Sequence, residues 1–215
     1  MRAPGNLTLA LAAGVVAAAV LAFFFVDRPL AAFSYAHFHH GRAPFVALTH
    51  LVDFLELAAV GGLVWAGGMV ATGRRLGANG LVVLRVSLAL FLAEGVKQLA
   101  KFAFGRTWPE TWTSKISTCG NPSFIRDGAF GFAPFHGGAG WSSFPSGHET
   151  LVCAVAGCLW VAAPRLRPFC AAAVVLVGAG LLGADYHWLS DVLAGGLLGW
   201  TIGLFAARLT IEPRA

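Results

Sequence analysis

The sequence predicts an all-α membrane protein, a bundle of six transmembrane helices with a short interfacial helix after the first. Of the 215 residues, 57% are hydrophobic and 12% are charged, about half the charged share of a soluble domain. The mean hydropathy is +0.72. The apolar residues form six blocks at or near the roughly 17–25 residues that a helix needs to cross a bilayer. These blocks are Leu7–Val26, Phe45–Thr72, Leu81–Phe104, His148–Ala163, Phe169–Gly183 and Asp191–Leu209. We assign residues 1–215 to one integral-membrane domain.

The connections between the blocks predict how the protein lies in the membrane. The first block is long for the core of a signal peptide and has no clear cleavage site after it, so we expect a retained span. Two short connections are basic, with Arg74-Arg75 and Arg165/Arg167, and such connections tend to stay in the cytoplasm. We therefore expect a multi-pass protein of a bacterial inner membrane with both termini cytoplasmic. The segment Asp27–Arg42 is too short to span and favours an interfacial helix.

One long polar and aromatic loop, Gly105–Phe144, separates the third and fourth blocks. Loops of this length in compact folds are usually functional or disordered, and the aromatic residues throughout this one favour an ordered cap at the outer interface. The aromatic side chains would either steer a head group or form an interfacial belt.

Charged residues inside the second and third blocks need an explanation, because charges are costly to place in a membrane. Glu94, Lys97 and Lys101 recur at i, i+3 and i+7 and therefore share one helical face. We expect a lattice of ion pairs between the two helices, in which Asp53 or Glu56 binds Lys97.

Three polar clusters are predicted to reach the same side of the membrane. With the N-terminus inside, the third and fifth helices end outside, and the fourth and sixth begin there. This topology brings together Lys101 with Arg106, the segment Pro145–His148, and the pair His187 and Asp191. Random placement would scatter these clusters over both faces, so we expect a functional site that faces the outside.

The start of the fourth helix and its neighbouring cations are suited to binding phosphate. A helix that begins at Pro-Ser-Gly offers free backbone amides and the positive end of its dipole. Gly147 lets a ligand oxygen approach the backbone, and the Ser146 hydroxyl can donate a further hydrogen bond. Lys101 and Arg106 add positive charge. Such a site neutralises the oxygens of a phosphoryl group during its transfer.

Two histidines and an aspartate supply the remaining chemistry. His187 and Asp191 are one helical turn apart, so the carboxylate can hold a proton on one ring nitrogen and leave the other free to attack. His148 is placed to protonate the leaving alkoxide and then to activate water. The predicted site has three catalytic residues and four phosphate ligands. They are His187, His148 and Asp191, and Lys101, Arg106, Ser146 and Gly147.

At these residues the chain resembles the type 2 phosphatidic acid phosphatase family, whose superfamily includes vanadium haloperoxidases. Three motifs define that family: Lys, six residues, Arg-Pro; Pro-Ser-Gly-His; and Ser-Arg, five residues, His, three residues, Asp. The second motif is complete at Pro145–His148, the third contributes His187 and Asp191, and the first survives as Lys101 and Pro109. The resemblance extends over nearly the whole chain. It implies catalysis without a metal or cofactor, with His187 as nucleophile, Asp191 as its partner and His148 as general acid.

The chain departs from the family pattern at two arginines. The arginine of the first motif falls on Trp108, and that of the third falls on Leu181. Arg106, two residues before Trp108, is a candidate replacement for the first. For the second, cations could reach in from the loop or a span. The candidates are Arg126, Lys115, His136 and Lys97.

Two unusual acids adjoin the histidines, Glu149 after His148 and Asp185 before His187. They could tune the histidines, bind a cationic substrate group or simply face solvent, and acidic residues are mostly exposed. The sequence leaves these alternatives open.

The leading functional hypothesis is a phosphatase acting on a lipid phosphate or lipid pyrophosphate at the outer face of the membrane. The alternatives are a catalytically impaired relative that binds or transports a lipid phosphate, and a lipid phosphotransferase. The expected partner is a membrane lipid and not nucleic acid, since the basic residues lie mostly between apolar blocks. Phosphatidic acid, phosphatidylglycerol phosphate, a polyprenyl pyrophosphate and a lipid A phosphate all fit, and no oligomeric state is indicated.

Overall fold

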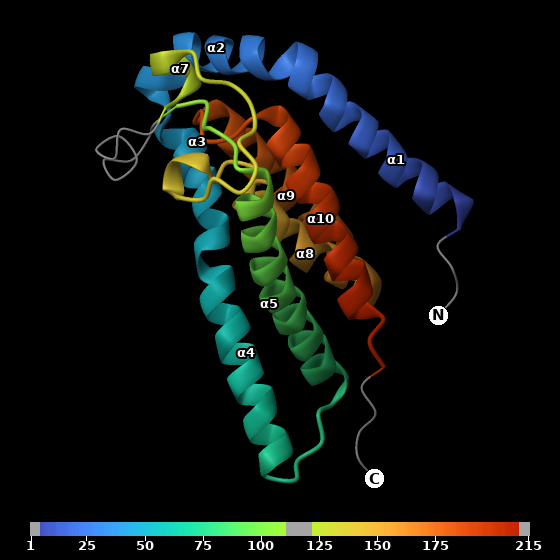
Figure 1. Ribbon diagram of the computed structural model, residues 1–215. Coiled ribbons are helices and arrows are strands. Elements are labelled where there is room, and N and C mark those ends of the chain that lie inside the picture. Colours follow the sequence, from blue (N-terminus) through green and yellow to red (C-terminus); the bar gives the residue numbers. More distant parts are fainter. Residues whose placement is uncertain (1–4, 111–121, 211–215) are drawn as a thin grey trace.

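The computed structural model describes residues 5–110 and 122–210, and every regular element in these ranges is a helix (Figure 1). Five helical stretches in this part of the chain are long and apolar enough to cross a membrane. They are Thr8–Gly41, Ala43–Ala71, Ala78–Phe104, Pro164–Gly183 and Leu189–Ala207. The expected all-α fold is therefore confirmed. The helix α8, Gly147–Ala162, matches the fourth predicted block but has only 16 residues, so the sixth span stays a prediction.

The first helical stretch continues past the predicted boundary at Val26. Helix α1 (Asn6–Leu21) runs through a π-helical turn, η1 (Ala22–Val26), into α2 (Asp27–Phe38), which ends in a short 3₁₀ turn, His39–Gly41. Figure 1 shows the path bending between α1 and α2, and helices bend at π turns and at prolines such as Pro29. The predicted interfacial helix is thus continuous with the first span, and its depth in the membrane stays a prediction.

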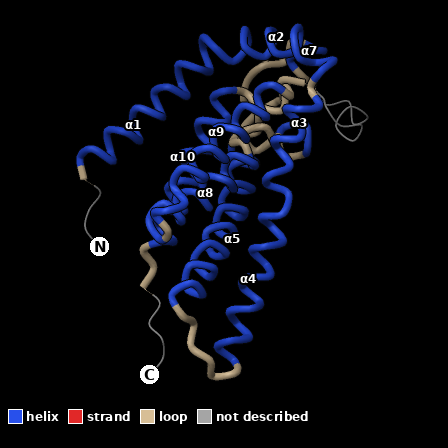
Figure 2. Tube along the Cα trace, turned by 180° about the vertical axis from the view of Figure 1, so that it is seen from behind, coloured by secondary structure: helices blue, strands red, loops and turns tan. Residues whose placement is uncertain are grey.

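The second stretch comprises α3 (Ala43–Thr49), a 3₁₀ turn, His50–Val52, and α4 (Asp53–Ala71). Helix α4 lies beside α5 (Ala78–Phe104) and runs in the opposite direction (Figures 1 and 2). Helix α3 packs on α9 (Arg167–Gly183) where α9 carries glycines. A Cβ added to Gly183 of α9 would lie 2.2 Å from the ring of Phe45 of α3.

Helices α8 and α10 (Leu189–Ala207) share the most extensive contact among the described helices. Three glycines at i, i+4 and i+8 of α10 face the backbone of α8. A Cβ at Gly195, Gly199 or Gly203 would lie 2.6, 2.0 or 2.3 Å from a carbonyl oxygen of α8 or of its cap Ser146. Small residues at this spacing let membrane helices approach closely.

We expect Gly199→Ala to destabilise the protein by about 1–3 kcal/mol, because the new methyl group overlaps the carbonyl of Thr150 and pushes α8 from α10. Gly67→Ala in α4 is the matched control, because nothing lies within 4 Å of a Cβ there. Its effect is expected to be stabilising and below about 1 kcal/mol. Unfolding in detergent measures both, and equal stabilities would contradict the close packing of α8 on α10.

The predicted convergence of the polar clusters is present. Helix α5 ends, α8 begins, α9 ends and α10 begins at the same end of the bundle, where the loop after α5 covers them (Figures 1 and 2). Gly105 turns the chain out of α5 at φ +52°, and a Cβ there would lie 2.0 Å from the oxygen of Ala133. The described part of the loop contains α7 (Phe124–Asp127) and a 3₁₀ turn, Ala139–Trp141. This part of the predicted cap covers the end of the bundle, whereas residues 111–121 of the loop lie outside the described residues and the position of the cap at the outer interface stays a prediction.

Candidate active site

A pocket of about 510 Å³ opens at this end of the bundle. It contains both predicted catalytic histidines and two lysines of α5, with walls from α4, the loop and α8. Its polar and aromatic lining residues are Asp53, Glu56, Lys97, Gln98, Lys101, Trp108, Ser142, His148, Tyr186 and His187. The sequence-predicted pair His148 and His187 thus shares one cavity.

His187 is held by Asp191, as the spacing predicts. Nδ1 of the imidazole lies 3.3 Å from the Asp191 carboxylate, so Nε2 is the nitrogen left for chemistry. Asp191 is fully buried and also accepts hydrogen bonds from the Ser143 hydroxyl (2.5 Å) and the Trp188 amide (3.3 Å). Burial holds the pKa of His187 below its usual value, so the imidazole is neutral at neutral pH.

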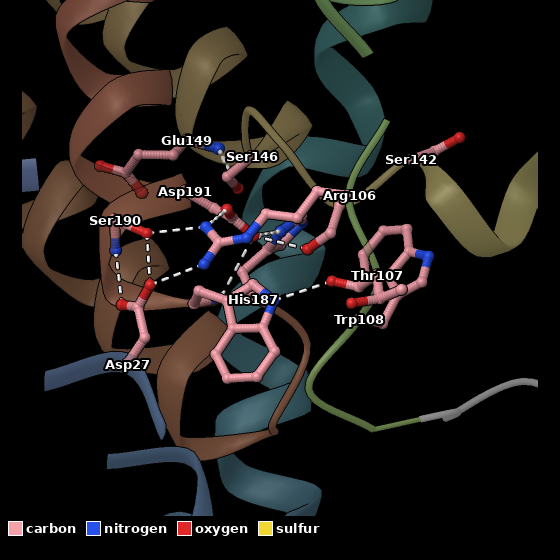
Figure 3. A network of polar contacts seen from close by, with 12 residues as sticks. Asp27, Arg106, Thr107, Trp108, Ser142, Ser146, Glu149, His187, Ser190 and Asp191 are labelled. Atoms are coloured by element: carbon pink, nitrogen blue, oxygen red, sulfur yellow. Dashed lines mark hydrogen bonds and ion pairs between the residues drawn. The ribbon is translucent and has the colours of Figure 1, made fainter. Parts of the chain in front are cut away.

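Arg106 lies in a different place from the predicted one. Its side chain is fully buried and does not line the pocket. The guanidinium pairs with Asp191 on one side and with Asp27 (2.7 Å) on the other (Figure 3). It also donates to the Ser190 hydroxyl at 2.7 Å. The two buried carboxylates hold Arg106 behind Asp191, so the expected contact with phosphate is replaced by a contact with the partner of His187.

The start of α8 is fastened to the start of α10. The Ser146 amide donates to the Asp191 carbonyl oxygen at 3.1 Å, and the Ser146 hydroxyl accepts from the Glu149 amide at 3.5 Å. Ser146 is fully buried and therefore acts as a helix cap rather than as a visible pocket wall. The next residue, Gly147, lines the pocket, where the first amides of a helix lack intrahelical partners.

Two lysines of α5 provide positive charge. Lys101 donates from Nζ to the Ser142 carbonyl oxygen at 2.5 Å. Lys97 pairs with Glu94 at 2.5 Å and with Glu56 at 3.5 Å, which confirms the Glu56 alternative of the predicted lattice. The other alternative, Asp53, contacts His50 instead at 2.5 Å.

Lys97 also reaches the start of α8, as expected of a candidate for the missing second arginine. Its Nζ lies 3.5 Å from the position of a Cβ on Gly147, beside the first turn of α8. Of the candidates for the missing second arginine, Arg126 pairs with Asp127 and His136 stacks on Trp141, while Lys115 lies outside the described residues. Within the described part of the chain, Lys97 is therefore the candidate that reaches the pocket.

Trp108, at the position of the first motif's arginine, forms a wall of the pocket. Its ring lies 4.9 Å from the ring of His187, between centroids, and 5.4 Å from Nζ of Lys101. The indole nitrogen donates to the Ala139 carbonyl oxygen at 2.8 Å. A flat apolar surface thus positions the imidazole where the family motif has a cation.

Glu149 and Asp185 do not face solvent, so that interpretation is wrong. Glu149 is 3% exposed and lies between α8, α9 and α10, where its side chain lies beside Gly178 and Gly196. Asp185 is 1% exposed, at φ +57° in the turn between α9 and α10. Neither of its carboxylate oxygens has a hydrogen-bond partner among the described residues. Neither acid lines the pocket.

The buried Asp185 is expected to make stability depend on pH. Burial raises its pKa to about 7, against about 3.9 in an unfolded chain. Between these values the folded state keeps a proton that the unfolded state releases, so stability falls as pH rises from about 4 to about 7. Asparagine tolerates a positive φ as aspartate does. Asp185→Asn should therefore remove this loss of stability, which is on the order of 4 kcal/mol at most.

Thermal unfolding in detergent at pH 4 and pH 8 checks this expectation. Asp185→Asn should unfold at a higher temperature than the parent at pH 8 and at a similar one at pH 4. Asp127→Asn is a control with the opposite expected sign. The hydrogen bonds from Arg126 and from the Ser123 amide hold the pKa of exposed Asp127 below its usual value, so this substitution should lower rather than raise the unfolding temperature at pH 8. Parallel curves for the parent and Asp185→Asn would contradict the assignment.

Residues 82–213 match the sequence profile of the PAP2 superfamily. Two similar curated proteins are lipid A 1-phosphatases, from Rhizobium etli and Rhizobium johnstonii. Each is 38% identical over 87 residues, which is 40% of this chain and 38% and 36% of those proteins, respectively. The matched region thus spans well under half of each relative. No solved structure matches the chain.

Proposed function

Because the chain belongs to the PAP2 superfamily, we propose that it is a membrane phosphatase that hydrolyses a lipid phosphate or lipid pyrophosphate without a metal ion. The observation that carries this proposal is the pocket in which His148, His187, Lys97 and Lys101 meet. The similarity to lipid A 1-phosphatases supports a lipid as the substrate, and a phosphorylated lipid is the substrate that a membrane-embedded site serves best.

In the proposed first step, Nε2 of His187 attacks phosphorus and the bond to the leaving oxygen breaks. Lys97, Lys101 and the first amides of α8 at Gly147 neutralise the phosphoryl oxygens. His148 gives its proton to the departing alkoxide. Asp191 keeps the proton on Nδ1 and stabilises the positive charge that the imidazole gains. The products are the lipid alcohol and a phosphohistidine at His187.

In the second step, water attacks phosphorus while His148 takes a proton from it, and the P–N bond breaks. The electron pair returns to Nε2 of His187, and inorganic phosphate leaves. His148 is then protonated for the next cycle, so protons balance over the two steps. Ser146 contributes by capping α8, which keeps the Gly147 amide pointed at the phosphate.

We place this site at the outer face of the membrane and both termini in the cytoplasm. The basic connections Arg74-Arg75 and Arg165/Arg167 support this orientation, because they lie at the ends of α4, α5, α8 and α9 far from the pocket. Labelling of single cysteines at these connections in intact cells and in broken cells would test it.

The substrate test uses purified full-length protein in detergent with a chelator. Lipid A 1-phosphate, phosphatidic acid, phosphatidylglycerol phosphate and a polyprenyl pyrophosphate are offered separately, and released phosphate is measured. Release from at least one, without added metal, is expected. Binding without release from any of them would indicate the impaired relative, and transfer of label to an added acceptor lipid would indicate a phosphotransferase.

A further inference from the structure

We propose that Asp27 and Arg106 are positioning residues, which together set the charge and orientation of Asp191 and, through it, of His187; this inference rests on the proposed function. Neither residue lines the pocket. Both are at most 1% exposed, and Asp27 lies outside the stretch that matches the family profile.

A continuous chain of contacts links the N-terminal helix to the imidazole. The Asp27 carboxylate accepts from Arg106 at 2.7 Å and from the Ser190 amide at 3.0 Å. Arg106 donates its other nitrogen, Nη1, to Asp191, whose second oxygen lies 3.3 Å from Nδ1 of His187. Figure 3 shows the guanidinium between the two carboxylates. The planar guanidinium of Arg106 therefore orients Asp191 through one carboxylate oxygen, while His187 contacts the other.

Aromatic rings surround the guanidinium. Its central carbon lies over the rings of Phe23 at 5.0 Å, Phe130 at 5.4 Å, Phe132 at 4.9 Å and Trp188 at 5.2 Å. These contacts exclude water and suit a delocalised, weakly hydrated cation. Phe23 belongs to the π turn and Asp27 follows it directly. The π turn thus presents both the ring and the carboxylate to Arg106, and such turns often occur at functional sites.

The pairing with Asp27 has an electrostatic consequence. With Asp27 absent, the whole positive charge of Arg106 would act on Asp191 and His187, in a medium where charges interact strongly. The imidazole would then be less basic and the developing positive charge on it less stable. Because Asp27 pairs with the same guanidinium, it offsets part of the positive charge of Arg106. The negative charge of Asp191 then acts more fully on His187. Other charged groups around His187 stay unchanged by substitutions at Asp27. These are Asp53 and Glu56 from α4, Lys97 and Lys101 from α5 and His148 from α8.

The test measures the pKa of His187 by nitrogen NMR of histidine-labelled protein in detergent, assigned with His187→Gln, together with kcat and KM for phosphate release. Asp27→Asn should lower the pKa of His187 and move the acid limb of kcat to lower pH. We expect kcat to fall about 10- to 100-fold with KM nearly unchanged, because Asp27 does not touch the pocket.

The double variant Asp27→Asn/Arg106→Gln removes both charges and leaves no unpaired buried cation, so it also serves if the single variant fails to fold. It should raise the pKa of His187 above the parent value, because the nearer positive charge is gone. Ser34→Ala is the matched control. Ser34 is buried on α2 and donates to the Leu182 carbonyl oxygen at 2.8 Å, so stability should fall and the pKa of His187 should not move.

An unchanged pKa of His187 in either Asp27 variant would overturn the proposal. A change in KM as large as the fall in kcat would overturn it as well. The titration needs no turnover. A parent protein that releases no phosphate would therefore refute the proposed function, while the pKa shifts would still decide whether Asp27 and Arg106 position Asp191.

Discussion

Replacing His187 by asparagine is expected to reduce phosphate release to the uncatalysed background. The imidazole is the one protein group that forms a bond to phosphorus in the proposed mechanism, and an amide side chain cannot replace it as a nucleophile. Asparagine still fills part of the space beside Trp108 and can still face Asp191, so the fold should survive. Phosphate release and unfolding temperature, measured on the same preparation, separate the two effects.

The same substitution should abolish the covalent intermediate. Parent protein quenched during turnover with labelled lipid phosphate should carry label that is stable to base and released by acid, as expected for a phosphoramidate at His187. Gly67→Ala, remote from the pocket and with open space at its Cβ, should label like the parent. Turnover by His187→Asn at the parental rate would eliminate the phosphohistidine mechanism.

The sequence predicted the helices and the convergence of the motifs because both depend on local rules. Apolar blocks of spanning length specify the helices, and alternating helix directions specify which ends meet. Within one helix, spacing determines which side chains share a face, so His187 and Asp191 could be paired correctly. The backbone amides at Gly147 follow from where α8 begins.

The role of Arg106 could not be predicted in this way. Its partner Asp27 is 79 residues away in the chain, and no spacing rule connects them. Gly105 turns the chain by a close approach to Ala133, which is a tertiary contact. The proximity of Arg106 to the first motif favoured a phosphate ligand, whereas two buried carboxylates hold it behind Asp191.

The burial of Glu149 could not be predicted from the sequence. Acids are mostly exposed on average, and that average misled the interpretation at Glu149. The relevant features were Gly178 and Gly196 on the neighbouring helices, which lie beside the Glu149 side chain. Whether these glycines lie beside Glu149 depends on how α8, α9 and α10 pack. Their proximity to Glu149 is therefore visible only in the structure.

Replacing His148 by glutamine is expected to slow the first chemical step in a way that depends on the leaving group. An alkoxide leaving from a lipid monophosphate needs a proton, so loss of the general acid should slow it by about 10²–10⁴-fold. When His187 attacks the terminal phosphorus of a lipid pyrophosphate, the leaving group is the lipid monophosphate, which is stable as an anion and needs no proton. For that substrate the loss should be much smaller.

Single-turnover formation of the phosphohistidine is the right measurement, because His148 also activates water in the second step and would slow steady-state turnover for both substrates. Lys101→Met is the control, since it removes a charge that stabilises the phosphoryl oxygens whichever group departs. It should slow both substrates alike. If His148→Gln also slowed both equally, the histidine would be binding the phosphoryl group rather than protonating the leaving oxygen, and another donor at the pocket would have to supply that proton.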